Sequence, residues 1–108
     1  MWSEWKPMPK PARCRNIAGP DGAGVYQIRN TKLNIFVLFG IGTNCRKRMK
    51  SFFPAPDGTG TRNNKCKREY VLHNWPVLEY RTMETENREI AKSIENDMKN
   101  QHNHIFNT

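Results

Sequence analysis

Two apolar stretches joined by a short polar linker constrain the fold of this chain most strongly. Residues 24–30 (GVYQIRN) and 34–40 (NIFVLFG) are rich in β-branched and aromatic residues, which predicts two strands with a hairpin connection. Residues 76–83 (PVLEYRTM) predict a third strand that begins at a proline. We therefore expect an α/β chain of the α+β type, in which helices flank a small three-stranded antiparallel sheet.

Two helices with apolar stripes are expected beside this sheet. Residues 44–53 predict a helix that follows a glycine turn at residues 40–42, with Asn44 as its N-cap. Residues 85–100 predict a longer amphipathic helix. The apolar stripe of the first helix consists of Cys45, Met49, Phe52 and Phe53, and that of the second of Ile90, Ala91, Ile94 and Met98.

The chain divides into an arm and one domain, since 108 residues suffice for a single modest core. Residues 1–23 contain four of the seven prolines and two tryptophans, which predicts an extended arm whose tryptophans pack on the domain. The domain comprises residues 24–108. Within it, residues 54–65 are rich in helix and strand breakers and predict a loop, and residues 68–75 predict a short helix.

Positive charge is concentrated in the middle of the sequence. The formal net charge is +8, and residues 46–69 carry eight basic residues against two acidic ones. A segment of one sign favours a polyanionic partner over a merely solubilising surface. No apolar run has membrane length and no signal peptide is recognisable, so we expect a cytoplasmic protein. Its three cysteines (Cys14, Cys45 and Cys66) form no CxxC pair and are expected to be reduced thiols.

The predicted helix at residues 44–53 places its four cations differently. On a helical wheel Arg46, Lys47 and Lys50 point away from the apolar stripe as surface charges, whereas Arg48 borders the stripe. A guanidinium held by packing is suited to bidentate recognition of a phosphate. The alternative is that the Arg48 stem covers the core while its head points to water, and the wheel leaves both readings open.

The order and spacing of several motifs resemble the GIY-YIG nuclease family. GVY at residues 24–26 matches the first motif, and Arg48 stands eight residues after Gly40, the family's usual distance to its essential arginine. The segment RMKSFF is similar to the one that follows this arginine in the excision-repair branch. Glu95 precedes Asn107 by twelve residues, as the metal-binding glutamate precedes the asparagine in that branch. The resemblance covers residues 24–108, nearly the whole chain.

The second motif departs from the family because it contains no tyrosine. Aligned without gaps, it falls on Leu38, Phe39 and Gly40. Aligned with a two-residue deletion before the helix, it falls on Gly40, Ile41 and Gly42. Phe39 is the nearest aromatic residue in either alignment. The motif glycines are therefore taken to be Gly24, Gly40 and Gly42.

The resemblance implies a metal-dependent DNA endonuclease that hydrolyses phosphodiester bonds. In it, Tyr26 is the general base, Arg48 holds the scissile phosphate, and Glu95 holds one Mg²⁺ or Mn²⁺. A phenol, with a pKa of about 10, needs nearby cations or a metal-bound hydroxide to act near neutral pH. Asn107 is expected to order the closing segment or the water network. The helical wheel alone does not distinguish Glu95 from Asp97, so this choice follows the family spacing.

The implied partner is double-stranded or branched DNA, bound by its backbone in a bacterial or phage-infected cell. No membrane contact and no small-molecule cofactor are expected, and the pattern specifies no oligomeric state. The compact size favours a phage or mobile-element enzyme. The missing tyrosine supports an alternative, a catalytically weakened GIY-YIG fold that binds nucleic acid or protein. The residues expected to bind nucleic acid are Arg46, Lys47, Lys50, Arg62, Lys65, Lys67 and Arg68.

The tripeptide HNH at residues 102–104 spells the name of another nuclease family. The residues that define that family are spread through a ββα-metal motif, so three contiguous residues do not indicate membership of it. We expect His102 and His104 to be exposed or near the mouth of the active site.

Overall fold

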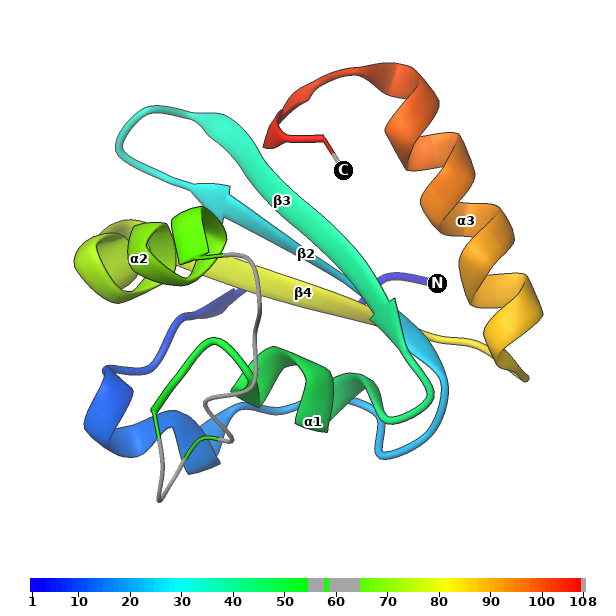
Figure 1. Cartoon of the computed structure of the whole chain (residues 1–108), viewed down its shortest axis with the longest axis horizontal. Helices are drawn as coiled ribbons and strands as arrows, with labels where there is room; N and C mark the ends of the chain where they lie inside the picture. Colours follow the sequence, from blue (N-terminus) through cyan, green and yellow to red (C-terminus); the bar gives the residue numbers. More distant parts are fainter. Residues whose placement is uncertain (55–57, 59–64, 108) are drawn as a thin grey trace.

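A five-stranded sheet with the strand order β1-β4-β2-β3-β5 forms the centre of the molecule (Figure 1). The computed structural model describes residues 1–54, 58 and 65–107. Neighbouring strands are antiparallel, except that β3 and β5 are parallel. The α+β class expected from the sequence is confirmed. The strands are β1 (Lys6–Pro7), β2 (Gly24–Asn30), β3 (Ile35–Gly42), β4 (Leu78–Glu84) and β5 (His104–Phe106).

The expectation of a three-stranded antiparallel sheet is wrong in strand number and in direction. β1 adds an edge strand beside β4, and β5 adds a parallel edge strand beside Phe36 and Leu38 of β3. These two strands have two and three residues, too few to show an alternating pattern in the sequence. The three longer strands lie where they were expected, β2 with the predicted bounds and the other two shifted by one or two residues.

The glycines at the end of the second apolar stretch belong to β3, so the predicted glycine turn is wrong. Gly40 pairs with Tyr26, and Gly42 pairs with Gly24, which extends the β2–β3 ladder to the end of the strand. The turn between β2 and β3 instead contains Asn34 at φ 55°, a left-handed conformation that asparagine tolerates.

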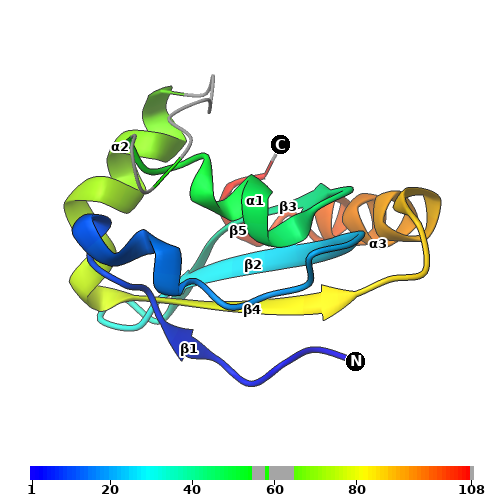
Figure 2. The ribbon, with the colours of Figure 1, turned by 90° about the horizontal axis from the view of Figure 1, so that it is seen from below.

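Helices α1 (Cys45–Lys50) and α2 (Lys65–Asn74) lie on the same side of the sheet, as Figure 2 shows. α1 starts at its predicted N-cap, because the Asn44 side chain accepts a hydrogen bond from the Lys47 N–H at 2.9 Å. α1 ends at Lys50 and not at residue 53, and α2 begins at Lys65 and not at residue 68. Most of the loop predicted at residues 54–65 lies outside the described residues. A short 3-10 helix (Trp75–Val77) connects α2 to β4. The predicted apolar stripe of Cys45, Met49, Phe52 and Phe53 is fully buried.

Helix α3 (Arg88–Gln101) runs beside the sheet near β3 (Figure 1). Ala91 and Met98 are buried in a cluster with Val25 and Phe39, as the amphipathic pattern predicted. Ile90 is the exception, since 41% of it is exposed. The predicted stripe is therefore narrower than the four residues suggested.

The proline-rich arm packs on the domain through its tryptophans, as expected, but it is not extended throughout, because Pro11–Asn16 form a 3-10 helix. The Trp5 ring stacks on Phe36 with ring centroids 6.4 Å apart, and the Arg29 guanidinium lies 4.1 Å from the Trp5 centroid. The Arg81 guanidinium lies 4.5 Å from the Trp2 centroid and 4.6 Å from the Trp5 centroid. The arm also supplies core side chains, namely Met8, Cys14 and Ile17. In the described part of the chain, no helix combines the length and apolarity needed to cross a bilayer.

His104 was expected to be exposed or near the mouth of the active site, and its burial shows the first alternative to be wrong. Its ring stacks on Phe36 at 5.1 Å and meets Phe39 edge-on at 4.7 Å. Its Nε2 lies 3.0 Å from the Gln27 amide nitrogen, and Gln27 Oε1 accepts a hydrogen bond from Arg81 Nε at 2.8 Å. Burial lowers the pKa of His104 to about 4. A polar chain thus runs from the arm-covered Arg81 to the tail of the molecule.

Candidate functional site

A cleft of about 420 Å³ opens at the edge of β3, and the end of that strand passes between α1 and α3 (Figure 1). β5 pairs with β3 at Phe36 and Leu38, so in the described structure no strand covers the later part of this edge. The cleft brings together residues from β2, β3, α1, α2 and α3. Its lining consists of Tyr26, Phe39, Gly40, Ile41, Gly42, Thr43, Arg48, Lys67, Arg88, Lys92 and Glu95.

Tyr26 reaches this cleft because the strand beside it has no side chain opposite the phenol. A Cβ atom added at Gly40 would overlap the Tyr26 hydroxyl and would lie 2.6 Å from its Cζ. The other side of the ring is fixed by Phe52, which meets it edge-on at 6.1 Å. A side chain at residue 40 would displace the Tyr26 phenol, so the packing of Tyr26 requires a glycine at this position.

Arg48 enters the cleft from α1, and a second motif glycine makes room for it. A Cβ atom at Gly42 would lie 2.9 Å from Arg48 Cβ. The start of α1 is anchored by two backbone hydrogen bonds to the segment that precedes β2, from the Cys45 N–H to the Gly22 carbonyl and from the Arg46 N–H to the Pro20 carbonyl, both at 3.0 Å. The backbone of α1 is thus held in place beside the cleft, and Arg48 itself is exposed there.

Glu95 reaches the cleft from α3, while Asp97 is exposed and is not among the lining residues. The structure therefore separates two carboxylates that the helical wheel did not distinguish. Glu95 Oε1 lies 2.9 Å from Lys92 Nζ, one turn earlier on the same helix. The packing of Ala91 and Met98 against the sheet turns this polar face of α3 toward the cleft.

Three further cations line the cleft, and their position there was not predicted. Lys67 was expected among the residues that bind nucleic acid but not at this cleft, and it lies in the first turn of α2 with only 7% exposed. Arg88 and Lys92 were not singled out at all. Lys92 follows Arg88 by four residues, and Glu95 follows Lys92 by three. This is the spacing of residues on one face of a helix, so a search for a polar stripe on α3 would have found them.

Asn107 does not line the cleft. Its side-chain amide donates a hydrogen bond to the Lys99 carbonyl at 2.7 Å and lies 3.4 Å from His102 Nδ1. It therefore orders the segment after α3, where His102 has a left-handed φ of 50°. This position agrees with the expected ordering of the closing segment, and a role in catalysis stays a prediction.

The residues predicted to bind nucleic acid lie in several environments. Lys47 and Lys65 are exposed, and Lys50 and Arg68 are half-buried. Arg46 is not the surface charge expected from the wheel. Its guanidinium donates to the Ile17 carbonyl at 2.9 Å and to the Arg15 carbonyl at 3.2 Å, so it joins the arm to α1. Arg62 lies outside the described residues.

Phe39, the nearest aromatic residue to the missing tyrosine, does not replace its hydroxyl. It packs with Val25, Ala91 and Met98 on the α3 side of the sheet, and part of it forms a wall of the cleft. Gly40 and Gly42 lie at the cleft together, so both alignments of the second motif lead to the same edge of β3.

The donor set at this cleft fits one Mg²⁺ or Mn²⁺ held by Glu95 and fits no cage made of protein ligands. Among the described residues, no group of three or more His, Cys, Asp or Glu side chains is placed to hold a metal. Mg²⁺ keeps several waters and commonly uses one or two carboxylates together with substrate phosphate oxygens. The Glu95 carboxylate is paired with the Lys92 ammonium at 2.9 Å.

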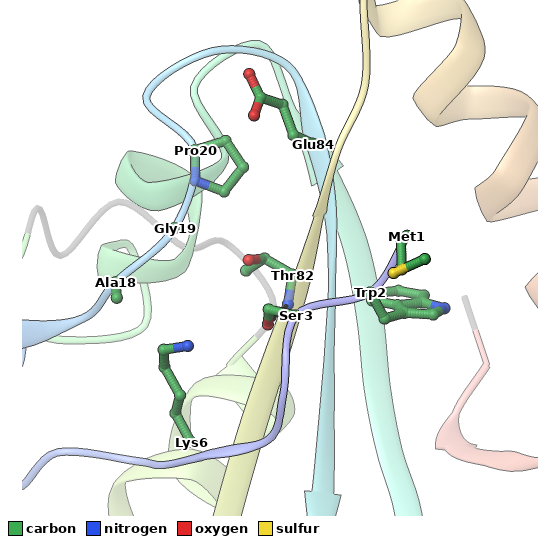
Figure 3. Close-up of a pocket in the computed structure, with 9 residues that line it drawn as sticks. All are labelled: Met1, Trp2, Ser3, Lys6, Ala18, Gly19, Pro20, Thr82 and Glu84. Atoms are coloured by element: carbon green, nitrogen blue, oxygen red, sulfur yellow. Dashed lines mark hydrogen bonds between the residues drawn. The ribbon is translucent and has the colours of Figure 1, made fainter.

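A second groove, of about 440 Å³, lies between the arm and β4 (Figure 3). Figure 3 shows Lys6 and Glu84 near its two ends and Ser3 beside Thr82 in the middle. Ser3 and Thr82 are joined by hydrogen bonds of 2.7 and 3.0 Å that attach the arm to the sheet. The groove is lined by Met1, Trp2, Ser3, Lys6, Ala18, Gly19, Pro20, Thr82 and Glu84.

Comparison of the chain with protein-family models, with curated proteins and with solved structures found no significant match. The function is therefore argued from the residues of the chain itself. Of the two hollows, only the cleft at β3 gathers residues that the motif pattern had selected.

Proposed function

We propose that the protein is a metal-dependent endonuclease that hydrolyses phosphodiester bonds in double-stranded or branched DNA. The observation that carries the proposal is the convergence of Tyr26, Arg48 and Glu95 on one cleft from β2, α1 and α3. These residues lie far apart in the sequence, and the GIY-YIG resemblance selects all three. A phenol, a guanidinium and a carboxylate are groups that can serve as proton acceptor, phosphate ligand and metal ligand in such a reaction.

Arg48 is the residue proposed to hold the scissile phosphate. Its guanidinium can donate two hydrogen bonds to phosphate oxygens, and the absence of a side chain at Gly42 leaves room for the Arg48 Cβ beside the cleft. Lys67 and Arg88 add positive charge to the same cleft. Cations placed before the reaction begins stabilise the negative charge that grows on the phosphoryl oxygens.

Tyr26 is the residue proposed to take a proton from the attacking water. Only 1% of it is exposed, and it lines the cleft, so the surrounding packing determines where its hydroxyl lies. Such positioning is what proton transfer in a transition state requires.

Glu95 is the residue proposed to hold the metal ion. When bound, Mg²⁺ or Mn²⁺ supplies Lewis acidity and stabilises charge on the leaving oxygen. Asn107 is proposed to keep the end of α3 in place, through its hydrogen bond to the Lys99 carbonyl.

A second candidate is a weakened GIY-YIG fold that binds nucleic acid or protein without cleaving it. The observation that favours this function is Phe39, which leaves the β3 side of the cleft without the second phenol. Both functions would use the basic residues of α1 and α2 to bind DNA, so DNA binding alone does not distinguish the two functions.

The test is cleavage of supercoiled plasmid and branched DNA by the purified protein with Mg²⁺, Mn²⁺ or EDTA. We expect cleavage with either metal and none with EDTA. Glu95→Gln should abolish cleavage, Tyr26→Phe should nearly abolish it, and both variants should still bind DNA. Glu89→Gln is the matched control, because Glu89 is an exposed carboxylate of α3 that does not line the cleft. DNA binding by the wild type without any cleavage would establish the binding module instead.

A further inference from the structure

The cleft contains more positive charge than one metal site accounts for. Among the described residues that line it, Glu95 is the only acid, and Arg48, Lys67, Arg88 and Lys92 are all basic. Like charges that face one hollow raise the free energy of any further cation placed there. A divalent ion entering the free protein would meet repulsion from these cations as well as attraction to Glu95.

Glu95 is already paired with a cation in the free protein. Its Oε1 lies 2.9 Å from Lys92 Nζ, and its side chain is only 18% exposed, compared with 50% for Lys92. The carboxylate therefore lies at the sheltered end of the pair, where solvent screens the attraction less than at an open surface. The pair joins residues three apart on α3, so the helix itself brings the two groups together.

We propose that Lys92 occupies the cation position of Glu95 in the free protein, and that the metal ion enters together with a nucleic-acid phosphate. The inference rests on the proposed function, since it takes Glu95 as the metal ligand. A phosphate in the cleft brings negative charge to Arg48, Lys67 and Arg88, and this removes most of the repulsion. The phosphate also offers the Lys92 ammonium a second acceptor, so Lys92 can leave Glu95 when the metal arrives. Metal and DNA then bind cooperatively, because each lowers the electrostatic cost of the other.

An ordinary surface pair on a helix would behave differently. Such pairs contribute little because solvent and salt screen both partners. Removing Lys92 would then leave the affinity for a metal ion unchanged. If Lys92 instead competes with the metal, its removal both uncovers Glu95 and takes one positive charge from the cleft.

The experiment measures Mn²⁺ binding to the full chain by the electron paramagnetic resonance signal of the free ion, first without DNA. We expect Lys92→Met and Lys92→Gln to bind Mn²⁺ about tenfold more tightly than the wild type. Lys92→Arg keeps the positive charge and should resemble the wild type. Lys99→Met removes the same charge from an exposed position on α3 that does not line the cleft, and should also resemble the wild type. The double variant Lys92→Met with Glu95→Gln should lose the gain.

The same titration is then repeated with a short DNA duplex, after subtracting the ions bound by the duplex alone. We expect the wild type to gain Mn²⁺ affinity on adding the duplex, and Glu95→Gln to show no such gain. If the two neutral Lys92 variants match the wild type without DNA while Glu95→Gln still loses the DNA-dependent ion, the inference is overturned and the proposed nuclease stands. If no variant binds Mn²⁺ with or without the duplex, the proposed metal site fails and the inference fails with it.

Discussion

The cleft at β3 and the groove between the arm and β4 have almost the same volume, about 420 and 440 Å³, but differ in how their polar groups are arranged. One row of cross-strand neighbours reaches both, because Gly40 pairs with Tyr26 and Tyr26 pairs with Thr82. In the groove, Thr82 is bonded to Ser3 of the arm, and the charged residues Lys6 and Glu84 have opposite signs. In the cleft, four cations, a phenol and one carboxylate converge. Convergent charge, and not the size of the hollow, is therefore the reason to propose the cleft as the site.

Among the tests that compare the two hollows, the largest effect on cleavage is expected from removing one cation from each. Arg48→Ala should lower the rate of metal-dependent plasmid cleavage by about 10³-fold, because it removes a donor that stabilises charge on the phosphate. Lys6→Ala, which alters the groove, should leave the rate within about twofold. Initial nicking rates of the two variants test the comparison directly. Equal losses would show that the hollows act as one site or that neither is the site.

A smaller effect is expected from filling the space beside Tyr26. Gly40→Ala places a Cβ atom against the phenol and should lower cleavage by about 10²-fold through misplacement of the hydroxyl. It should also destabilise the fold by about 1–3 kcal/mol, since the site is overpacked. Gly22→Ala is the control, because a Cβ atom there meets no other atom within 4 Å. Plasmid nicking and urea denaturation of both variants give the two readouts, and unchanged nicking by Gly40→Ala would separate Tyr26 from the chemistry.

The sequence predicted those parts of the site that depend on long regular elements. β2 and β3 are recognisable by their composition, so Tyr26 and the strand opposite it were placed correctly. The Asn44 cap and the buried Met49 stripe fixed the position of α1, and with it the border position of Arg48. Local propensity and helical period are sufficient for these features, because they act over a few neighbouring residues.

Other features depend on contacts that no local pattern encodes. β5 forms because Phe36 and Leu38 offer an edge to a segment of three residues. Ile105 and Phe106 favour a strand, but three residues are too few to show an alternating pattern. His104 is buried because the parallel pairing places its ring against Phe36 and Phe39. The choice of Glu95 over Asp97 likewise follows from how α3 packs on the sheet. Tertiary packing decides these three features. Local patterns missed β5, gave an exposed position for His104 as one alternative, and did not distinguish Glu95 from Asp97, which only the family spacing separated.

The comparison extends to the surface around the cleft, where a roughly tenfold effect is expected. Lys47 and Lys65 are exposed on the helices that carry Arg48 and Lys67. The double variant Lys47→Gln with Lys65→Gln should weaken binding to all duplex sequences by about tenfold near physiological salt. The slope of log affinity against log salt should fall by about 0.9 for each phosphate that the variant no longer neutralises.

The matched control for this surface is the double variant Lys32→Gln with Lys99→Gln. It removes the same charge from exposed positions at the β2–β3 turn and near the end of α3. Fluorescence anisotropy with labelled duplexes at several salt concentrations gives both affinity and slope. A loss that depends on the DNA sequence, or an equal loss in the control, would show that the basic helices do not form a general backbone-binding surface.

The smallest expected effect tests whether the arm and the cleft are linked through the fold. His104 stacks on Phe36 and meets Phe39, and Gln27 connects it to Arg81, over which the two tryptophans of the arm lie.

Burial holds the pKa of His104 at about 4 in the folded protein, against 6.5 in an unfolded chain. The unfolded chain therefore binds the proton first as the pH falls. The stability from neutral His104 is fully present above pH 6.5 and is lost between pH 6.5 and 4.

We expect this loss to be about 1 kcal/mol, roughly fivefold in the folding equilibrium, because β5 is a short edge strand that can open locally and admit water. Urea denaturation followed by tryptophan fluorescence above pH 6.5 and near pH 4 measures it. His104→Gln should flatten the pH dependence over this range, whereas His73→Gln, at an exposed position of α2, should keep the wild-type slope. Because Phe39 is a wall of the cleft, the acid-induced loss should reduce DNA cleavage as well as the tryptophan signal of the arm. A wild-type slope in His104→Gln would mean that other groups carry the acid response and that the two regions are independent.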